Sequence, residues 1–143
     1  MGVDVETVRE PTDEVVAAVC HLLPQLSTSA TPLDAAAIAR MLAWDGNTLL
    51  VARVDGEIVG MLTLVMFPIP TGLRAWIEDV VVDAAGRGRG VGAALTQEAI
   101  RLAQAEGAKS VDLTSRPSRE AANRLYERLG FQARETKLYR HAG

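Results

Sequence analysis

The residues with the clearest chemical signature form a glycine- and arginine-rich segment at 86–92. Glycine stands at positions 86, 88, 90 and 92, with Arg87 and Arg89 between them. A β-branched run precedes the segment and an amphipathic helix pattern follows it. Glycine lets a backbone approach a ligand closely, a helix start offers unpaired N–H groups and the positive end of the dipole, and guanidinium groups pair with phosphate oxygens. The segment therefore predicts a diphosphate-binding loop.

Three kinds of phosphate-binding loop compete for this segment. The nucleoside-triphosphate loop is excluded because the segment contains no Gly-Lys-Ser or Gly-Lys-Thr. The dinucleotide pattern fits Gly88, Gly90 and Ala93, but that fold usually carries it on the first strand, and too little sequence follows here. The pattern R-x-x-G-x-G fits Arg87, Gly90 and Gly92 and resembles the acyl-CoA pyrophosphate loop of the GNAT superfamily of N-acyltransferases. A flexible turn without a ligand is the remaining alternative.

The elements that must position this loop are predicted from periodicity and from capping residues. Pro11 and Thr12 open a first helix that should end near Pro24. Thr31 is expected to cap a second helix, with Pro32 at its first position. The sequence predicts strands at 3–9, 48–54, 57–67, 74–82, 110–115 and within 131–141, a loop at 68–72, and helices at about 11–24, 31–43, 91–106 and 118–129. This order indicates one domain over residues 1–143, of the α/β class, with a mixed sheet between helices on both faces.

A second motif lies in the helix predicted at 118–129. Residues 123–131 read Asn-Arg-Leu-Tyr-Glu-Arg-Leu-Gly-Phe and are similar to the N-x-x-Y-x-x-x-G-F segment of the GNAT superfamily. The two motifs stand in that family's order, and the order of the predicted elements agrees with it. The chain is therefore identified as a member of this superfamily. The resemblance implies a mixed, mostly antiparallel sheet and the transfer of an acyl group from acetyl-CoA to an amine, but it does not name the amine.

The resemblance also implies where acetyl-CoA would bind. The loop backbone and its two arginines would hold the pyrophosphate, and the pantetheine arm would run beside the strand before the loop. An N–H group of that strand would stabilise the developing oxyanion. Asn123 would hydrogen-bond the cofactor, and the alternative for it is a solvent-facing helix residue. The implied cofactor-binding residues are Val80, Val81, Val82, Arg87, Gly88, Arg89, Gly90, Val91, Gly92 and Asn123.

Tyr126 matches the general acid of the family. A phenol with a pKa of about 10 is protonated at neutral pH and is acidic enough to deliver a proton to the leaving thiolate. The alternative is a core tyrosine whose hydroxyl group meets a backbone carbonyl.

Glu78 and Asp79 are the candidates for a base that deprotonates the amine, and they resemble the acidic pair of aminosugar-acetylating members. A lysine-type amine is unfavourable to deprotonate at pH 7 by roughly 4.6 kcal/mol, whereas an α-amine faces only about 1 kcal/mol. Neighbouring strand residues point to opposite faces, so one of the two is expected to face the substrate, and Glu78 is favoured. A structural carboxylate is the alternative for each. Relatives that acetylate protein N-termini carry a glutamate at the place of Thr114, so that specificity is not expected.

Charge is unevenly distributed along the chain. The net charge of −3 combines 4 basic and 11 acidic side chains in residues 1–82 with 11 basic and 7 acidic side chains in residues 83–143. The basic half contains the loop and suits an anionic cofactor. In the family, the acceptor enters from the side of the first helices, so the acidic half predicts a cationic amine. The alternative is that these acids form a solvated surface.

The composition excludes several other classes of protein. Aromatic residues make up 4% and no dense basic run occurs, so nucleic-acid binding is not expected. The longest apolar run, residues 61–67, is too short to span a membrane, and no secretory signal is visible. The lone Cys20 favours a reducing, cytoplasmic compartment. No metal is expected. The sequence leaves a homodimer open, and a catalytically idle acyl-CoA-binding module of the same fold is the alternative function.

Overall fold

The computed structural model of the chain describes residues 2–143. Its five strands form one sheet in the order β1-β2-β3-β4-β5. The strands from β1 to β4 are antiparallel to their neighbours, and β5 is parallel to β4. The elements are β1 (Asp4–Thr7), α1 (Asp13–Leu26), α2 (Ala35–Ala43), β2 (Asn47–Val54), β3 (Glu57–Ile69), β4 (Gly72–Val82), a 3-10 turn (Ala84–Gly86), α3 (Val91–Ala105), β5 (Val111–Asp112) and α4 (Glu120–Arg128).

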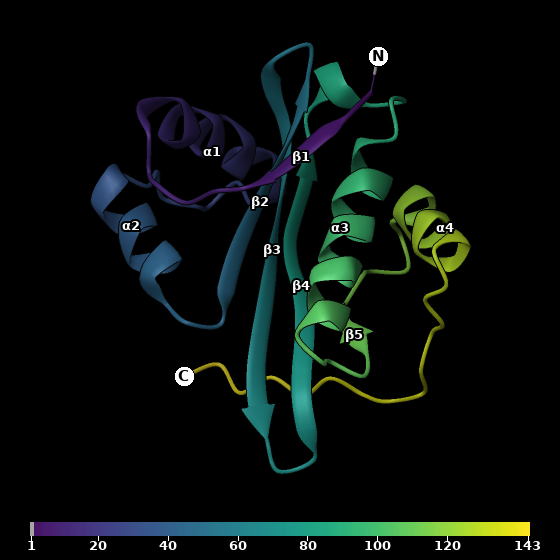
Figure 1. The fold of residues 1–143 in the computed structure, drawn as a ribbon. Helices are drawn as coiled ribbons and strands as arrows, with labels where there is room; N and C mark the ends of the chain where they lie inside the picture. Colours follow the sequence, from purple (N-terminus) through teal and green to yellow (C-terminus); the bar gives the residue numbers. More distant parts are fainter. Residues whose placement is uncertain (1) are drawn as a thin grey trace.

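Helices cover both faces of this sheet. α1 and α2 lie on one face, and α3 lies on the other with α4 beside it (Figure 1). One buried apolar cluster, with Leu22 and Ile38, packs the first pair of helices on the sheet. A second cluster, with Leu62, Leu64 and Leu95, packs α3 on the opposite face. The predicted α/β class and the mostly antiparallel sheet between two helical layers are confirmed.

The observed end of α1 and the observed start of α2 differ from the predicted ones. α1 opens at the expected place, and the Thr12 hydroxyl caps it by accepting from the Val15 N–H at 3.2 Å. The helix ends at Leu26, two residues past Pro24, near which its end was expected. α2 begins only at Ala35, because the Asp34 carboxylate accepts from the Ala37 N–H at 2.8 Å and caps the helix in place of Thr31. Among residues 2–143, no helix has the length and apolar character needed to cross a bilayer.

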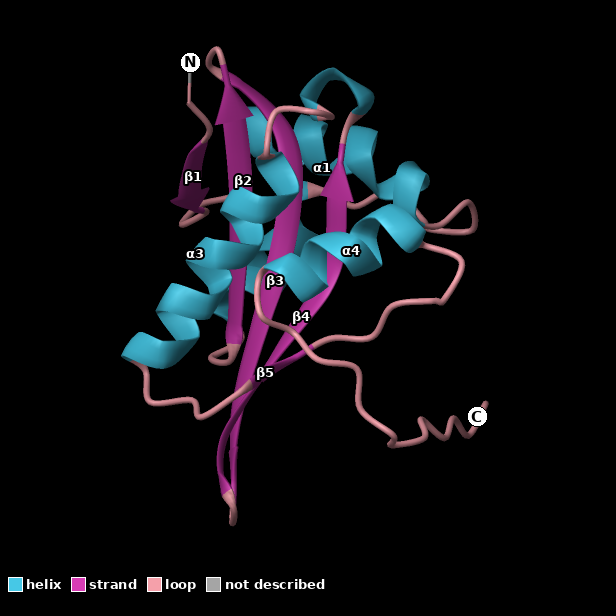
Figure 2. Ribbon diagram, turned by 90° about the vertical axis from the view of Figure 1, so that its right-hand side faces the viewer, coloured by secondary structure: helices cyan, strands magenta, loops and turns pink. Residues whose placement is uncertain are grey.

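The β3–β4 hairpin is longer than predicted. The loop expected at 68–72 is wrong, because β3 runs to Ile69 and β4 starts at Gly72, with which Ile69 pairs. The pairing of β2 with β3 ends at Val65, so Pro68 lies where β3 has no second neighbour and its missing N–H group costs no ladder bond. The hairpin therefore extends beyond the rest of the sheet (Figure 2).

The C-terminal part holds less regular structure than the sequence predicts. The strand expected within 131–141 is wrong, since these residues form neither helix nor strand. The strand expected at 110–115 is reduced to Val111–Asp112, and the last helix covers Glu120–Arg128. A segment forms a strand only when a neighbour pairs with it, and within residues 2–143 β5 has β4 as its single partner.

Gly60 lies where β3 and the first turn of α3 are in close contact. A Cβ atom at this position would lie 2.8 Å from Val91 Cγ1, 3.1 Å from the Val81 carbonyl oxygen and 3.2 Å from Leu95 Cδ1. A glycine therefore lets the first turn of α3 lie directly against the sheet, and this turn follows the glycine-rich loop.

Gly60→Ala is predicted to lower the free energy of unfolding by about 1–3 kcal/mol, the usual cost of overpacking a filled core. Urea denaturation measures this change. Gly2→Ala is the control, because a Cβ atom at Gly2 meets nothing within 4 Å. Equal midpoints for Gly60→Ala and the unmodified chain would show that α3 can shift without cost.

Candidate active site

β4 carries one extra residue just before the glycine-rich loop. Met61 of β3 pairs with Val81, and Thr63 pairs with Glu78, so two steps along β3 correspond to three along β4. Asp79 lies within this bulge and has a φ of 51°, in the left-handed region that residues other than glycine rarely adopt. A bulge bends its strand and redirects its side chains, and such features are frequent beside active sites.

β4 also loses its other neighbour before the bulge. β5 pairs with β4 only at Ala75 and Trp76. From residue 77 onward, the edge of β4 that faces away from β3 has no strand partner among the described residues. Val80, Val81 and Val82, the predicted cofactor residues of this strand, therefore lie on a free edge, where an extended ligand can hydrogen-bond to the backbone.

A cavity of about 160 Å³ opens at this place. It brings together the end of α1, the bulged part of β4, the residues after β5 and one face of α4. Tyr126, Glu78 and Asp79, the three predicted catalytic residues, all line it. The complete lining is Leu26, Ile77, Glu78, Asp79, Val80, Leu113, Thr114, Arg119 and Tyr126. Within residues 2–143, no group of three or more His, Cys, Asp or Glu side chains is placed to hold a metal ion.

The two carboxylates share the cavity. Partial burial raises the pKa of Glu78 above its ordinary value, and the negative charge of Asp79 raises it further. The expectation that Glu78 and Asp79 point to opposite faces of β4 is wrong, because the bulge breaks the strict alternation of the strand. Both side chains are exposed, and both contribute to the lining.

Tyr126 faces the carboxylates from α4. It is 7% exposed, and burial raises the pKa of its phenol, while the positive charge of Arg119 acts in the opposite direction. Its ring meets that of Phe131 edge-on, with 5.8 Å between the ring centroids. The Phe131 N–H donates to the Tyr126 carbonyl at 2.9 Å, which closes the end of α4. Tyr126 is therefore both packed in the core and present at the cavity.

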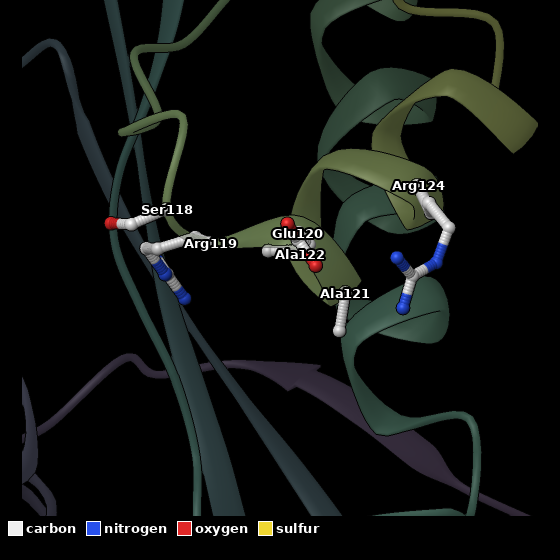
Figure 3. Close-up of a pocket in the computed structure, with 6 residues that line it drawn as sticks. All are labelled: Ser118, Arg119, Glu120, Ala121, Ala122 and Arg124. Atoms are coloured by element: carbon white, nitrogen blue, oxygen red, sulfur yellow. The ribbon is translucent and has the colours of Figure 1, made fainter.

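Arg119 is a site residue that the sequence analysis missed. It precedes Tyr126 by seven positions, two helical turns, so both side chains lie on one face of α4. The seven-residue spacing could have predicted that Arg119 and Tyr126 share a face. Only the orientation of α4 in the structure shows that this face lies toward β4. In Figure 3, the Arg119 side chain lies toward the strands and Arg124 lies on the other side of the helix. Arg119 also lines an open hollow at the start of α4, formed by Ser118, Arg119, Glu120, Ala121, Ala122 and Arg124.

The loop after β4 has the backbone of an anion-binding site. Gly88 and Gly90 both have a φ of 78°, and Gly90 is the N-cap of α3, so the free N–H groups of the first turn follow directly. Arg89 lies 3.7 Å from the carboxylate of Asp55, and both side chains are more than half exposed, so this pair is weak. Arg87 and Arg89 are exposed residues of this loop, which the sequence predicts to bind diphosphate.

The other two glycines of the loop serve packing. A Cβ atom at Gly86 would lie 2.9 Å from Val59 Cγ2, and one at Gly92 would lie 3.2 Å from Leu125 Cδ2. Gly86 is buried in the described structure, and Gly92 lets α4 lie close to α3. The segment therefore combines two glycines that shape the loop with two that allow close contacts.

Asn123 is engaged within the protein. Its side-chain carbonyl accepts from the Ser115 hydroxyl, and its amide group donates to the Arg116 carbonyl at 3.1 Å. These bonds hold the segment after β5 against α4, next to Thr114. A contact between Asn123 and a cofactor stays a prediction.

α1 is tied to the last residue before the loop. The Asp83 carboxylate accepts from the Gln25 amide at 2.8 Å and lies 3.2 Å from the His21 ring nitrogen. These contacts lower the pKa of Asp83, with the Gln25 bond as the largest cause. The end of α1 is therefore fixed relative to β4 and the loop.

These features define a class of protein: an α/β domain in which a glycine-rich loop at a helix start follows a bulged strand that carries two carboxylates. The particular family follows from the comparison of sequences. The model of the Acetyltransferase (GNAT) family matches residues 16–131, and the chain belongs to this family. It is an acyl-CoA-dependent N-acetyltransferase, as its named relatives are.

The relatives differ in the acceptors that their names give. The chain is 35% identical to a glucosamine 6-phosphate N-acetyltransferase of Trypanosoma brucei brucei over 78% of this chain and 79% of that protein. It is 37% identical to N-alpha-acetyltransferase 30 of Schizosaccharomyces pombe over 50% of this chain and 47% of that protein. A solved putative acetyltransferase from Agrobacterium tumefaciens is 29% identical, with a TM-score of 0.86 over 97% of this chain and 99% of that one.

Asp79→Asn is predicted to lower the pKa of Glu78 toward its ordinary value, because it removes a neighbouring negative charge. Carboxyl ¹³C NMR across a pH titration measures this shift directly. Since the folded-state pKa of Glu78 is raised, its contribution to the free energy of unfolding is present at low pH and lost as the pH rises through that value. Asp79→Asn should therefore reduce the fall in the free energy of unfolding over this pH range.

Asp55→Asn, at an exposed acid of the β2–β3 turn, is the control for the titration. An unchanged Glu78 titration in Asp79→Asn would mean that the two carboxylates do not share the cavity.

Proposed function

We propose that this protein transfers the acetyl group of acetyl-CoA directly to a primary amine, with Tyr126 as general acid and Glu78, Asp79 or a water molecule as base. The base takes a proton from the amine, the amine nitrogen attacks the thioester carbonyl and forms the C–N bond, and the C–S bond breaks as the CoA thiolate takes a proton from Tyr126. The observation that carries the proposal is the cavity in which Glu78, Asp79 and Tyr126 meet beside the free edge of β4.

Acetyl-CoA is proposed to lie along β4 and the following loop. The N–H groups around Gly88 and Gly90 and the first turn of α3 suit the pyrophosphate, and Arg87 and Arg89 add positive charge. The free edge at Val80, Val81 and Val82 suits the amide groups of the pantetheine arm. This path directs the thioester toward the bulge, where a backbone N–H would stabilise the oxyanion.

The environment of Tyr126 suits a general acid. Its raised pKa keeps the phenol protonated at neutral pH, as an acid must be before it acts. The positive charge of Arg119 would stabilise the phenolate that remains after the proton has left, until the site is reprotonated.

The environment of Glu78 suits a base for an amine of high pKa. Its raised pKa moves the carboxylate closer to neutral pH, and a base is most effective when its pKa lies near the working pH. Asp79 contributes a charge to the same cavity and can take the role directly or through a water molecule.

The acceptor is proposed to be a cationic amine, such as a polyamine, an aminoglycoside-like compound or a lysine side chain. Glu78 and Asp79 attract an ammonium group, and Arg119 balances one of their two charges. The name of the Trypanosoma relative points instead to a phosphorylated aminosugar, for which Arg119 is the cation in the lining. The two alternatives differ in the charge of the acceptor, so the charge of the preferred acceptor separates them.

Tyr126→Phe is predicted to lower turnover by roughly 10²–10⁴-fold while the fold and acetyl-CoA binding are retained, because only the proton donor is lost. Thiol detection of released CoA measures turnover, and isothermal titration measures acetyl-CoA binding. Tyr139→Phe makes the same chemical change at a tyrosine that is 86% exposed and serves as the control. Turnover of Tyr126→Phe within a few-fold of the unmodified enzyme would assign the acid to another group.

Glucosamine is predicted to give a higher kcat/KM than glucosamine 6-phosphate, and this advantage should shrink as salt is added, because salt screens the attraction of the carboxylates. The two sugars share the amine and the ring and differ in the phosphate group, and the salt dependence separates the effect of its charge from that of its size. Steady-state rates at low and moderate ionic strength measure the effect. A higher kcat/KM for the phosphorylated sugar at both salt concentrations would contradict a cationic preference.

A further inference from the structure

The last turn of α1, residues 23–26, is held in place by more than the helix itself. Pro24 lies inside α1 and has no N–H group to donate to the carbonyl of Cys20, so this part of the helix lacks one of its regular hydrogen bonds. Residues 27–34, which follow the turn, form neither helix nor strand. Contacts outside α1 therefore contribute to the position of its last turn.

Asp83 supplies such a contact. Its Oδ1 atom accepts from the Gln25 amide at 2.8 Å and lies 3.2 Å from Nε2 of His21. The backbone of Asp83 is itself fixed, because its N–H donates to the Val59 carbonyl at 2.8 Å and its carbonyl accepts from the Gly86 N–H at 2.8 Å. The side chain therefore offers α1 a hydrogen-bond acceptor in a defined place directly after β4.

The same turn of α1 reaches the candidate active site. Leu26 follows Gln25 in the sequence and lines the cavity that contains Glu78 and Asp79. Among the described residues, it is the only member of the lining that precedes β4. Its side chain is 37% exposed although it is large and apolar, so it forms part of a wall that a ligand can touch. A displacement of this turn would change that wall.

We propose that Asp83 is a positioning residue for the reaction, which holds the last turn of α1 through Gln25 and so fixes Leu26 against the two cavity carboxylates. The inference rests on the proposed function, in which acetyl-CoA covers the loop and the first turn of α3 while the amine approaches Glu78 or Asp79. α1 lies on the face of the sheet opposite α3, which leaves its side free for the amine (Figure 1). Asp83 thereby sets the acceptor wall relative to the acetyl-CoA loop, and such alignment contributes directly to rate.

The test exchanges the donor and the acceptor of this hydrogen bond. Gln25→Glu places a second carboxylate beside Asp83, and two like charges repel each other. Asp83→Asn keeps an oxygen that can accept from the Gln25 amide. In the double variant, the amide at position 83 donates to the carboxylate at position 25, so the bond forms again at the net charge of the unmodified chain. Gln104→Glu, at an exposed position of α3, is the control for the added charge.

The pKa of Glu78 reports on the wall without any acceptor. Burial is the main cause of its raised pKa, and Leu26 lines the same cavity. Displacement of Leu26 in Gln25→Glu should admit water and lower the pKa of Glu78, whereas the added negative charge alone would raise it. Carboxyl ¹³C NMR across a pH titration measures the change, and the double variant should return to the unmodified value.

A pKa of Glu78 that stays unchanged or rises in Gln25→Glu overturns the proposal. A lowered pKa that the double variant does not restore overturns it as well, because the loss then does not depend on the bond to Asp83. Gln104→Glu should leave the titration of Glu78 unchanged.

The KM for the amine separates positioning from general stability. With glucosamine as the amine, Gln25→Glu is expected to raise this KM about tenfold, the size expected for loss of a hydrogen bond to a charged group, and the double variant should restore it. Isothermal titration should give an unchanged dissociation constant for acetyl-CoA. Equal losses in both constants would mean that the bond only maintains the fold.

The Tyr126→Phe variant distinguishes failure of this inference from failure of the proposed function. Retained turnover in Tyr126→Phe contradicts the proposed function. Lost turnover in Tyr126→Phe, together with an unchanged Glu78 titration and an unchanged KM in Gln25→Glu, contradicts only the positioning role of Asp83.

Discussion

After Trp76, β4 no longer pairs with β5, and every part of the candidate site uses the space that this separation leaves. The free edge of β4 carries the residues proposed to align the pantetheine arm. The bulge at Asp79 lies on the same stretch and turns both acidic side chains toward the gap. α4 closes the gap from the far side and supplies Tyr126 and Arg119. A fully paired β4 and β5 would leave neither a cavity nor a free backbone edge.

The elements around this gap are held in fixed positions before any ligand arrives. Asp83, the residue between β4 and the loop, is bonded to Gln25 and contacts His21 of α1. Gly60 lets α3 start directly on the sheet, and Gly92 lets α4 pack against α3. These contacts fix α1, the glycine-rich loop and α4 in position relative to the end of β4. Such preorganisation is what direct transfer requires, because most of its rate comes from the alignment of the reacting groups.

The local features of the fold could be predicted from the sequence, and the features that depend on pairing could not. The loop glycines, the Thr12 cap and the helix of Tyr126 are encoded in short stretches, and the structure contains them. The bulge at Asp79 depends on the register between β3 and β4, so the expectation that Glu78 and Asp79 point apart was wrong. The place of Arg119 in the cavity depends on the orientation of α4, and residues 131–141 form no strand because no strand of the sheet pairs with them.

The account rests on acetyl-CoA lying along the free edge of β4 and over the loop at 87–92. Backbone amide NMR of the ¹⁵N-labelled protein, titrated with acetyl-CoA, tests this most directly because it reports on each N–H group separately. The account predicts that the largest shifts occur at residues 80–82 and 87–92, with smaller ones around Tyr126. Shifts confined to the hollow at the start of α4, or spread over α2 and the β3–β4 hairpin with residues 80–82 unchanged, would contradict it.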